Sequence, residues 1–421
     1  MRSVPGKNGS VMGRRRKRGS ILIVVTWVML IIVTVALVTA QRMRVEGAAQ
    51  ANRLAAMQAD QIERGAEQWV LCETDVMNGD AVTVMQQPGE AIQVGNGYFW
   101  LVRPDQDDPT VYDFGIADEG GKLNLNTATA DMLVNLPDMT QQAADSIVDW
   151  IDTDSTITNG DGAEDTYYMG LPDPYHCKND ALESVSELLL VQGMDRMQLY
   201  GYDLNQNGVM DASEQQASNG GAAFSAGGYD DPRGIYPFVT IWTTPAATTS
   251  TPGGGGGAGG GGGGAGGGGG AGGGGGGGAG GATTPVAKIN PNTASLQVFR
   301  CLPGLTDSDA QALVSARNPD TTDPTDIDWV QQASSSDKYS GIQNYLNGAS
   351  YIFSADIVAV SGDGRAFRRV KIVVDATSQP AKIVYRKDLT DLGWPLDPQI
   401  RTDLRAGKQP STSTLTFNGG T

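Results

Sequence analysis

The sequence has few of the residues on which nucleophilic and zinc-dependent enzymes rely. Its 421 residues include one histidine, His176, so a Ser-His-Asp or Cys-His arrangement has a single available base and a histidine-rich zinc site cannot be built. The three cysteines, Cys72, Cys177 and Cys301, lie far apart in the chain, so at most one intrachain disulfide can form. Ordinary hydrolase chemistry is therefore disfavoured.

Basic residues are also scarce along most of the chain. Residues 1–19 hold seven basic side chains and no acidic one, which leaves 23 basic against 47 acidic side chains in the remainder, a balance of −24. A body with this charge repels nucleic acid, so we do not expect DNA or RNA as a partner. The length exceeds what one core usually supports, which predicts more than one domain.

An uncharged apolar run follows the basic amino terminus. Residues Ser20 to Ala40 contain no charged side chain, and about 20 apolar residues at ~1.5 Å each span a bilayer core. We expect a single transmembrane helix, with the basic cluster at residues 14–18 in the cytoplasm and the bulk of the chain on the other side. A cleaved secretory signal is the alternative, although this run is longer than the usual apolar segment of about 7–15 residues.

The helix is expected to continue beyond the membrane. Residues 41–72 lack proline and are rich in Ala, Gln, Arg and Glu. Their larger apolar side chains fall near one helical face at Leu54, Ile62, Ala66, Trp69 and Val70. One half of this helix suits lipid and the other half suits packing, which favours lateral assembly.

These features resemble the type IV pilin and pseudopilin superfamily, with a basic leader that ends at Gly19, a small residue Ser20, and an apolar helix that becomes amphipathic. The resemblance implies cleavage after Gly19 by a prepilin peptidase and methylation of the new amine of Ser20. Most members have Glu as the fifth residue after the cut, whereas this chain has Val24. Because a carboxylate there can neutralise the amine of the preceding subunit, its absence suits a subunit at the tip.

An internal repeat lies in the second part of the chain. Residues 122–151 and 288–317 align at an offset of 166 with ten identical residues in 30 positions. In the two copies, Asn126-Thr127 and Asn292-Thr293 are expected to cap a first helix. A second helix is expected to begin near the threonines Thr140 and Thr306.

The repeat predicts two helix-hairpin-helix units. Related units in other proteins bind DNA through backbone amides of the hairpin, which favours small and basic residues in the turn. Here the first copy has Asp138, and Asp307 and Asp309 follow the turn of the second copy. A structural packing role is therefore the expectation, and DNA binding is the alternative.

Several short motifs occur around the first copy. They are the run 118–128, Asp149-Trp150-Ile151-Asp152, Gly162-Ala163-Glu164-Asp165, Tyr167-Tyr168 and the run 187–194. These motifs resemble the general secretion pathway protein K family, through most of residues 14–200 and again at 288–386. The resemblance implies a tip-forming minor pseudopilin of the type II secretion pseudopilus, anchored in the inner membrane with its bulk in the periplasm. The implied partners are other minor pseudopilins, contacted through the long helix, the prepilin peptidase, and secretion substrates or the outer-membrane channel.

The segment 203–214 fits the twelve-residue calcium loop at every ligand position, including a glycine at its sixth position. Its oxygen ligands would be Asp203, Asn205, Asn207, the Val209 carbonyl, Asp211 and Glu214. Residues 188–200 predict an incoming helix, whereas residues 215–221 predict no exit helix. We expect a lone structural calcium site with an affinity on the order of 10⁻⁴–10⁻³ M or somewhat tighter, and a solvated acidic turn is the alternative.

A second acidic segment lies within the first copy of the repeat and just after it. Six carboxylates occur within 17 residues, at Asp149, Asp152, Asp154, Asp161, Glu164 and Asp165. The protein K resemblance implies calcium in the helical domain, and the residues carried over for it are Asp152, Asp154, Glu164 and Asp165. A solvated loop, ion pairs with Lys178 and Arg196, and a general acid–base pair remain alternatives.

The rest of the chain predicts a sheet, a spacer and a tail. Residues 81–85, 98–102, 110–116, 351–360, 365–375 and 382–386 are predicted as strands. Residues 253–282 contain only 25 Gly and five Ala and predict a linker. The expected divisions are 1–19 leader, 20–40 membrane helix, 41–72 its periplasmic half, 73–121 first sheet part, 122–252 α-domain, 253–282 linker, 283–350 second hairpin region, 351–387 last strands and 388–421 flexible tail.

The predicted fold class is α+β. A long, pilin-like amino-terminal transmembrane helix packs on an antiparallel sheet, and an all-α domain with the helix-hairpin-helix units is inserted into that sheet. The predicted function is assembly rather than catalysis. Two other functions stay open: a DNA-uptake pseudopilin that binds DNA through the hairpin units, and a membrane-anchored calcium-dependent enzyme.

Overall fold

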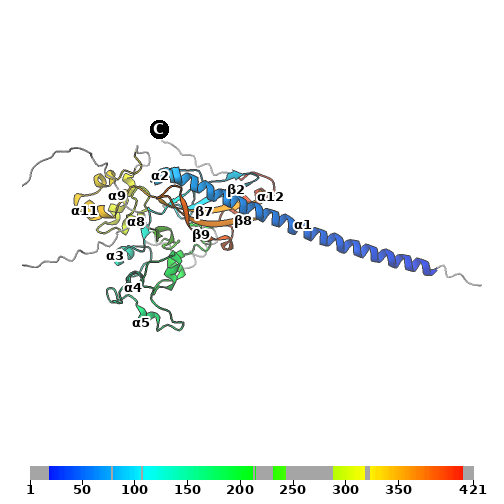
Figure 1. Ribbon diagram of the computed structural model, residues 1–421, viewed down its shortest axis with the longest axis horizontal. Coiled ribbons are helices and arrows are strands. Elements are labelled where there is room, and N and C mark those ends of the chain that lie inside the picture. Colours follow the sequence, from blue (N-terminus) through cyan, green and yellow to red (C-terminus); the bar gives the residue numbers. More distant parts are fainter. Residues whose placement is uncertain are drawn as a thin grey trace, which may run out of the picture. The chain divides into compact units, whose positions relative to one another are not determined.

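The computed structural model of the chain describes residues 19–76, 79–105, 108–211, 214, 231–242, 288–317 and 323–410. The chain divides into two compact units, residues 1–57 and 58–421, which are described separately. One helix, α1 (Gly19–Val76), begins in the first unit and ends in the second (Figure 1). The predicted leader up to residue 18 and the Gly/Ala linker lie outside the described residues.

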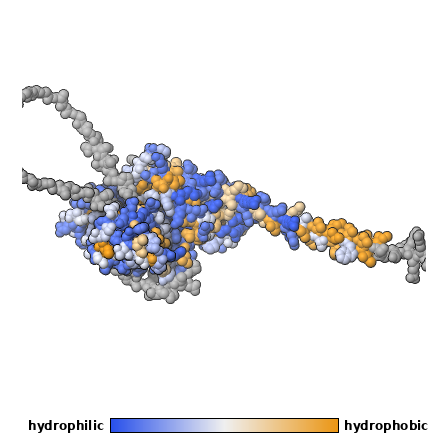
Figure 2. All heavy atoms as spheres, turned by 60° about the horizontal axis from the view of Figure 1, so that its bottom comes forward, coloured by the Kyte–Doolittle hydropathy of each residue, from blue (hydrophilic) through white to orange (hydrophobic). Residues whose placement is uncertain are grey.

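The first unit exposes the apolar half of α1. Every side chain from Ile21 to Gln50 is exposed, and Figure 2 shows apolar atoms along this part of the helix. By length and composition, α1 is the one described helix that is apolar enough to cross a membrane. The helix continues beyond the apolar run, as expected, and it ends at Val76, four residues past the predicted end at residue 72.

An antiparallel sheet forms the scaffold of the second unit. Its strand order is β1-β2-β7-β8-β9, with β3 paired to β2 and β4 paired to β7. The bounds are β1 (Ile92–Val94), β2 (Gly97–Pro104), β3 (Tyr112–Phe114), β4 (Ala117–Asp118), β7 (Ile352–Val360), β8 (Phe367–Asp375) and β9 (Lys382–Asp388). Five of the six predicted strand segments are confirmed, although the one at residues 110–116 is shorter than expected.

The two faces of the sheet are covered by different elements. Ile62, Ala66 and Val70 of α1 pack in one core with alternate strand residues such as Phe99 and Leu101. On the opposite face, Trp100, Val358 and Leu404 share a separate core. Leu404 belongs to α12 (Pro398–Arg405), so the carboxyl-terminal part of the described chain is folded onto the sheet.

Two predictions outside the insertion are wrong. Residues 81–85 form helix α2 (Ala81–Met85) rather than a strand, because the Asp80 carboxylate caps it by accepting from the Thr83 amide at 2.9 Å. Residues 388–410 are not a flexible tail, since they contain the 3₁₀ helix η4 (Thr390–Leu392) and α12. The remainder, residues 411–421, lies outside the described residues.

Residues between β4 and β7 form the predicted insertion, which is mainly helical. Its bounds are β5 (Leu123–Asn124), α3 (Ala130–Leu133), α4 (Gln141–Ile151), α5 (Asp165–Tyr168), η1 (Val185–Leu190), α6 (Arg196–Tyr200), η2 (Tyr236–Phe238), β6 (Val239–Thr240), α8 (Leu296–Arg300), α9 (Asp307–Ala316), α10 (Asp328–Ala333), α11 (Ser336–Ile342) and η3 (Gln343–Tyr345). It is not all-α, because β5 and β6 pair in parallel. Both copies of the repeat share one apolar core.

The second helix of each copy begins where expected. Thr140 and Thr306 are the N-caps of α4 and α9, and each hydroxyl accepts from a backbone amide three residues later. Thr129 and Ser295, not the predicted Asn-Thr pairs, occupy the N-cap positions of the first helices, and Ser295 accepts there from the Val298 amide whereas the Thr129 side chain makes no capping hydrogen bond. The asparagines Asn126 and Asn292 lie four residues before these helices begin, and their side chains bind distant groups instead.

Those asparagines hold each copy to a neighbouring segment. Asn126 accepts from the Leu182 amide at 2.7 Å and donates to the Ile241 carbonyl at 3.3 Å. At the equivalent position, Asn292 donates to the Pro324 carbonyl at 2.9 Å and accepts from the Trp329 indole at 2.8 Å. The duplicated sequence therefore conserves a side-chain-to-backbone brace as well as two helices.

Candidate metal-binding sites

The loop after α4 brings together three of the predicted carboxylates. Ligand oxygens of Asp152, Asp154 and Glu164 lie within 4.8 Å of one another. Asp152 is the C-cap of α4, and Asn159 and Gly160 take positive φ values of 50° and 88° in the turn that returns the chain to Glu164. Left-handed backbone at this turn is what Asn and Gly accommodate best.

Several oxygens at this cluster are buried without a hydrogen-bond partner. They are both carboxylate oxygens of Glu164 and Oδ2 of Asp149, whereas Asp149 Oδ1 accepts from the Thr158 amide at 2.8 Å. Asp149 is fully buried, and Glu164 is 4% exposed. Because an unpaired buried carboxylate is costly, these oxygens fit a cation bound between them. Oxygen-only ligands of this kind suit a hard cation such as Ca²⁺.

Neighbouring negative charge also affects proton binding at the cluster. Burial, followed by repulsion from Asp149, raises the pKa of Glu164. Burial also raises the pKa of Asp152, with repulsion from Asp154 and Asp149 adding to it. The side chains are thus held close enough to disfavour their shared ionisation, which a divalent cation would relieve.

Asp165, Lys178 and Arg196 have other partners and do not belong to this cluster. Asp165 accepts from the Cys177 amide at 2.7 Å and lies 3.1 Å from His176 Nδ1, so it is not among the grouped side chains. Lys178 pairs with Glu187 at 2.8 Å, and Arg196 donates to the Leu204 carbonyl. Ion pairs with Lys178 and Arg196 therefore do not neutralise the cluster in the described part of the chain.

The second candidate, segment 203–214, folds back on itself through its carboxylates. Asp203 accepts from the amides of Asn207 at 3.1 Å and Gly208 at 2.8 Å. Glu214 accepts from the amides of Leu204 at 2.9 Å and Asp211 at 3.0 Å. The first and last predicted ligands thus close one loop, although each carboxylate already has backbone donors.

The remaining predicted ligands line the turn of this loop. The Asn205 and Asn207 amide oxygens accept from the amides of Asn207 and Val209, and Gly208 has a φ of 77°. A Cβ at Gly208 would also lie 2.4 Å from Pro104 Cγ, so glycine is required there. The predicted incoming helix is shorter than expected, because α6 begins only at Arg196 after η1.

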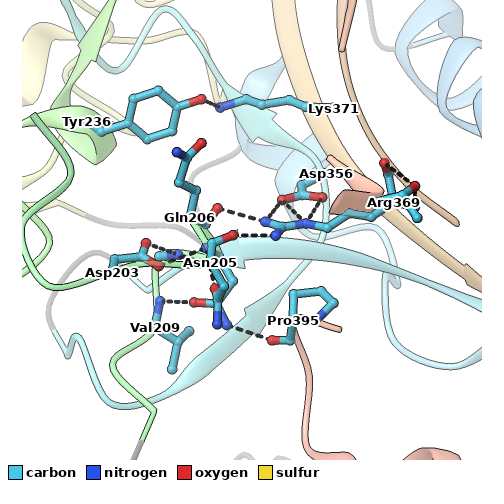
Figure 3. Close-up of polar contacts among 12 residues, drawn as sticks. Asp203, Asn205, Gln206, Val209, Tyr236, Asp356, Arg369, Lys371 and Pro395 are labelled. Carbon is cyan, nitrogen blue, oxygen red and sulfur yellow. Dashed lines mark hydrogen bonds and ion pairs between the residues drawn. The ribbon is translucent and has the colours of Figure 1, made fainter. Parts of the chain in front are cut away.

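Two buried arginines hold this loop in place. Arg369 of β8, whose side chain is fully buried, donates to the carbonyls of Asn205 and Gln206 and pairs with Asp356 (Figure 3). Arg233 donates to the Gly208 carbonyl at 3.3 Å and pairs with Asp231 at 2.8 Å. Burial raises the pKa of Asp203 to about 7, and Glu214 adds to that shift while the amides of Gly208 and Asn207 and the charge of Arg369 oppose it.

Three residues at the candidate sites, Asp149, Arg233 and Arg369, have roles in the fold that the sequence alone does not reveal. Asp149 was part of the acidic run, but nothing in its spacing showed that it would be buried. Arg233 and Arg369 belong to segments far from residues 203–214, so only the fold brings them to that loop. The cysteines form no disulfide, since Cys72, Cys177 and Cys301 are all free.

The residues of the predicted processing site are only partly described. Gly19 is the first residue of α1 and Ser20 follows it in the helix, but their side chains are outside the described set. Val24 is exposed on the same helix. Cleavage and methylation at this position therefore stay predictions.

Comparison with known proteins gives one consistent family. Residues 121–200 and 289–346 match family models described as type II secretion system (T2SS), protein K. The first match contains the acidic cluster and the first hairpin. The second begins at Ile289 and ends at Leu346, the two residues joined by an isolated parallel bridge.

Two curated relatives carry the same description. The type II secretion system protein K of Pectobacterium carotovorum subsp. carotovorum is 28% identical over 199 residues, which are 43% of this chain and 60% of the relative. That of Aeromonas hydrophila is 43% identical over 53 residues, or 13% of this chain and 16% of the relative. The chain thus spans less than two thirds of the length of either relative.

A solved structure also aligns with the chain. It is a crystal structure of the GspK-GspI-GspJ complex from the type 2 secretion system of enterotoxigenic Escherichia coli, with 13% sequence identity and a TM-score of 0.46. The alignment covers 79% of this chain and 96% of that one. The two family-model matches, in order along the sequence, and the two curated relatives all carry one description, so over residues 121–200 and 289–346 the chain is similar to the type II secretion system protein K family.

Proposed function

We propose that this chain is the tip-forming minor pseudopilin of a type II secretion pseudopilus. Its amino-terminal helix anchors it in the inner membrane, its bulk lies in the periplasm, and the prepilin peptidase cuts it after Gly19. It then assembles with other minor pseudopilins through α1 and acts in protein secretion across the outer membrane. Contacts with secretion substrates or the outer-membrane channel belong to the same proposal.

The observation that carries the proposal is the change in character along α1. Side chains from Ile21 to Gln50 are exposed and largely apolar, whereas Ile62, Ala66 and Val70 are buried against the sheet. An exposed apolar helix surface needs lipid or other helices around it. One helix therefore offers both an anchor and an assembly surface, while its carboxyl-terminal part holds the folded domain.

The tip position is supported by the lack of acidic residues early in α1. Val24 occupies the fifth position after the expected cut, and the first acidic residue of the helix is Glu46. A subunit without an intramembrane carboxylate offers no partner for the amine of an earlier subunit. Such a subunit can be followed in the fibre but is poorly suited to follow another.

Calcium binding is the second part of the proposal. Asp152, Asp154 and Glu164, with Asp149 beside them, would hold one Ca²⁺, and the oxygens of segment 203–214 would hold another. Bound calcium would supply positive charge that compensates the buried carboxylates. The protein's own residues position these oxygens: α4 presents Asp149 and Asp152, and the turn at Asn159 returns Glu164 to them.

The membrane-assembly proposal is tested by mass spectrometry of the mature protein, expressed with its prepilin peptidase. We expect loss of residues 1–19 and a methylated serine at the new amino terminus. Recovery of the intact leader, or a cut near Ala40, would contradict it. The tip assignment is tested separately with Val24→Glu, which should allow the subunit to cross-link to a preceding pseudopilin that the unchanged chain does not follow.

A further inference from the structure

Within the part of the chain that the structure describes, charged side chains form most of the lining of a groove between α1 and the last two strands. Its carboxylates belong to Asp60, Glu63 and Glu67 of α1 and to Asp388 of β9. Its guanidinium groups belong to Arg64 of α1, Arg368 of β8 and Arg386 of β9. Four acidic groups therefore face three basic groups where the helix meets the edge of the sheet.

Exposed ion pairs balance the outer part of this groove. Arg64 lies 3.4 Å from Asp60, and Arg368 lies 4.0 Å from Asp60 and 3.8 Å from Asp388. All four side chains are about one third exposed or more, so these pairs contribute little to stability. Two acids and two arginines match in charge here, which leaves the excess acid in the inner part of the groove.

The inner part consists of Glu63, Glu67 and Arg386, which join α1 to the edge strand β9. The Arg386 guanidinium donates to Glu63 at 2.9 Å and to Glu67 at 2.7 Å. Glu63 and Glu67 are one helical turn apart, so both carboxylates reach the same guanidinium. The side chain of Glu63 is 1% exposed, whereas that of Arg386 is 46% exposed. One guanidinium thus serves two carboxylates, and one of these is shielded from water.

Proton binding at Glu63 reflects this shortage of positive charge. Burial, followed by the hydrogen bond and the charge of Glu67, raises the pKa of Glu63 to about 7, while Arg386 opposes the shift. The hydrogen bond to Glu67 raises the pKa of Arg386, so the guanidinium stays charged. Glu63 is therefore the member of this group that changes its charge close to neutral pH.

We infer that Glu63, Glu67 and Arg386 form a proton-sensitive clasp between α1 and β9. With a proton on Glu63, its carboxyl donates to Glu67 and its other oxygen accepts from Arg386, so the three side chains carry no net charge. Loss of that proton leaves two carboxylates on one guanidinium, and their repulsion weakens the contact between helix and strand. The clasp is thus strongest in mildly acidic surroundings. It lies in the folded domain and does not rest on the proposed function.

The first test is denaturant unfolding of the full chain in detergent micelles, compared with Glu63→Gln from pH 5 to 8. The new amide can donate to Glu67 and accept from Arg386, so this variant imitates the protonated clasp at every pH. The pKa of Glu63 is about 7 in the folded protein against an ordinary 4.5, so unfolding releases a proton between these values. The folded-to-unfolded ratio of the unchanged chain, divided by that of the variant, should fall roughly tenfold per pH unit between about 5 and 7 and then level off.

Local opening is the second readout. At pH 8 the backbone amides of residues 382–388 should exchange hydrogen faster in the unchanged chain than in Glu63→Gln, and at pH 5 the two proteins should agree. Glu67→Gln should reduce the pH trend, because one source of repulsion is gone. Glu73→Gln, on α1 but outside the groove, should keep the trend whole. A pH trend that is the same in the unchanged chain and in Glu63→Gln, or that Glu67→Gln leaves unaltered, would overturn the inference.

Discussion

The two copies of the repeat have the same order of helices, but they differ in whether their acidic side chains have partners. Each has a short helix, a turn and a longer helix capped by a threonine, and each uses an asparagine to bind a distant segment. In the second copy the acids near the turn are paired: Asp307 with Arg300, and Asp309 with Lys338. In the first copy, acids on α4 are buried and keep oxygens without partners.

Equivalent positions make the difference plain. Asp145 and Asp149 of α4 correspond to Gln311 and Ser315 of α9 at the offset of 166. Both acids are fully buried, whereas Gln311 and Ser315 are exposed and neutral. The apolar positions did not diverge in this way, since Ile147 and Leu313 are both buried. Both copies of this packing unit thus keep an apolar core, while the first copy alone has buried acids in its second helix.

The largest expected effect comes from removing a buried acid of the first copy. In the unchanged protein, Ca²⁺ at about 100 times its dissociation constant should raise the free energy of unfolding by about 2.7 kcal/mol. Asp149→Asn should lose most of this gain, yet be no less stable than the unchanged chain in chelator, because an unpaired buried charge is absent. Denaturant melts with calcium and with chelator measure both quantities.

The matched control for that experiment is Ser315→Ala in the second copy. It should keep the full calcium response and change the free energy of unfolding by less than about 0.5 kcal/mol. A calcium response that survives Asp149→Asn unchanged would show that the difference between the two copies has nothing to do with a cation.

The shared part of the plan is tested by the two asparagines. Asn126→Ala and Asn292→Ala each strand backbone or indole groups that now have a partner, so each should lower the free energy of unfolding by about 2 to 3 kcal/mol. The losses should be similar and independent of calcium. If only one of the two variants is destabilised in denaturant melts, the brace is not a common feature of the repeat.

A smaller effect is expected from pH, with opposite signs at Glu164, which lies just after the first copy, and at Asp309 in the second copy. Burial raises the pKa of Glu164, so the calcium-free protein gains stability relative to Glu164→Gln as pH falls from 7 through that raised value. The Lys338 ammonium and the Thr306 hydroxyl and amide lower the pKa of Asp309 to about 2, so the advantage over Asp309→Asn is present above the ordinary value and lost as pH falls toward 2.

Melts of the three proteins in chelator between pH 2 and 7 compare these trends. Glu164→Gln should be the more stable protein at pH 7, and Asp309→Asn the less stable one, relative to the unchanged chain. Trends of the same sign would refute the contrast between an uncompensated and a compensated copy.

The smallest effect is expected at the helix caps. Thr140→Ala and Thr306→Ala should each cost about 1 kcal/mol, measured by thermal melts, because one backbone amide loses its side-chain acceptor. Thr306 also takes part in a reciprocal contact with Asp309, so its loss should be slightly greater. A negligible loss at both positions would mean that tertiary packing alone fixes the starts of α4 and α9.

Much of this scaffold is predictable from sequence, and the cluster is predictable only in part. Thr140 and Thr306 predict the starts of α4 and α9, because capping depends only on residues close in the sequence. Runs of β-branched residues predict β7 and β8. The burial of Asp149 is not local: it depends on Gly162, where a Cβ would lie 2.0 Å from Asp149 Oδ2. Residues 81–85 mislead because a β-rich run can still be set as a helix by one capping carboxylate.

The entry and exit of the insertion lie side by side on the sheet. Ala117 and Asp118 of β4 pair with Ser354 and Phe353 of β7, so the chain leaves and rejoins the scaffold at one rung of the ladder. A tight reverse turn between those strands would preserve the strand order without the insertion. The insertion can therefore be exchanged for domains of very different size, because β4 and β7 provide the same attachment point on the sheet.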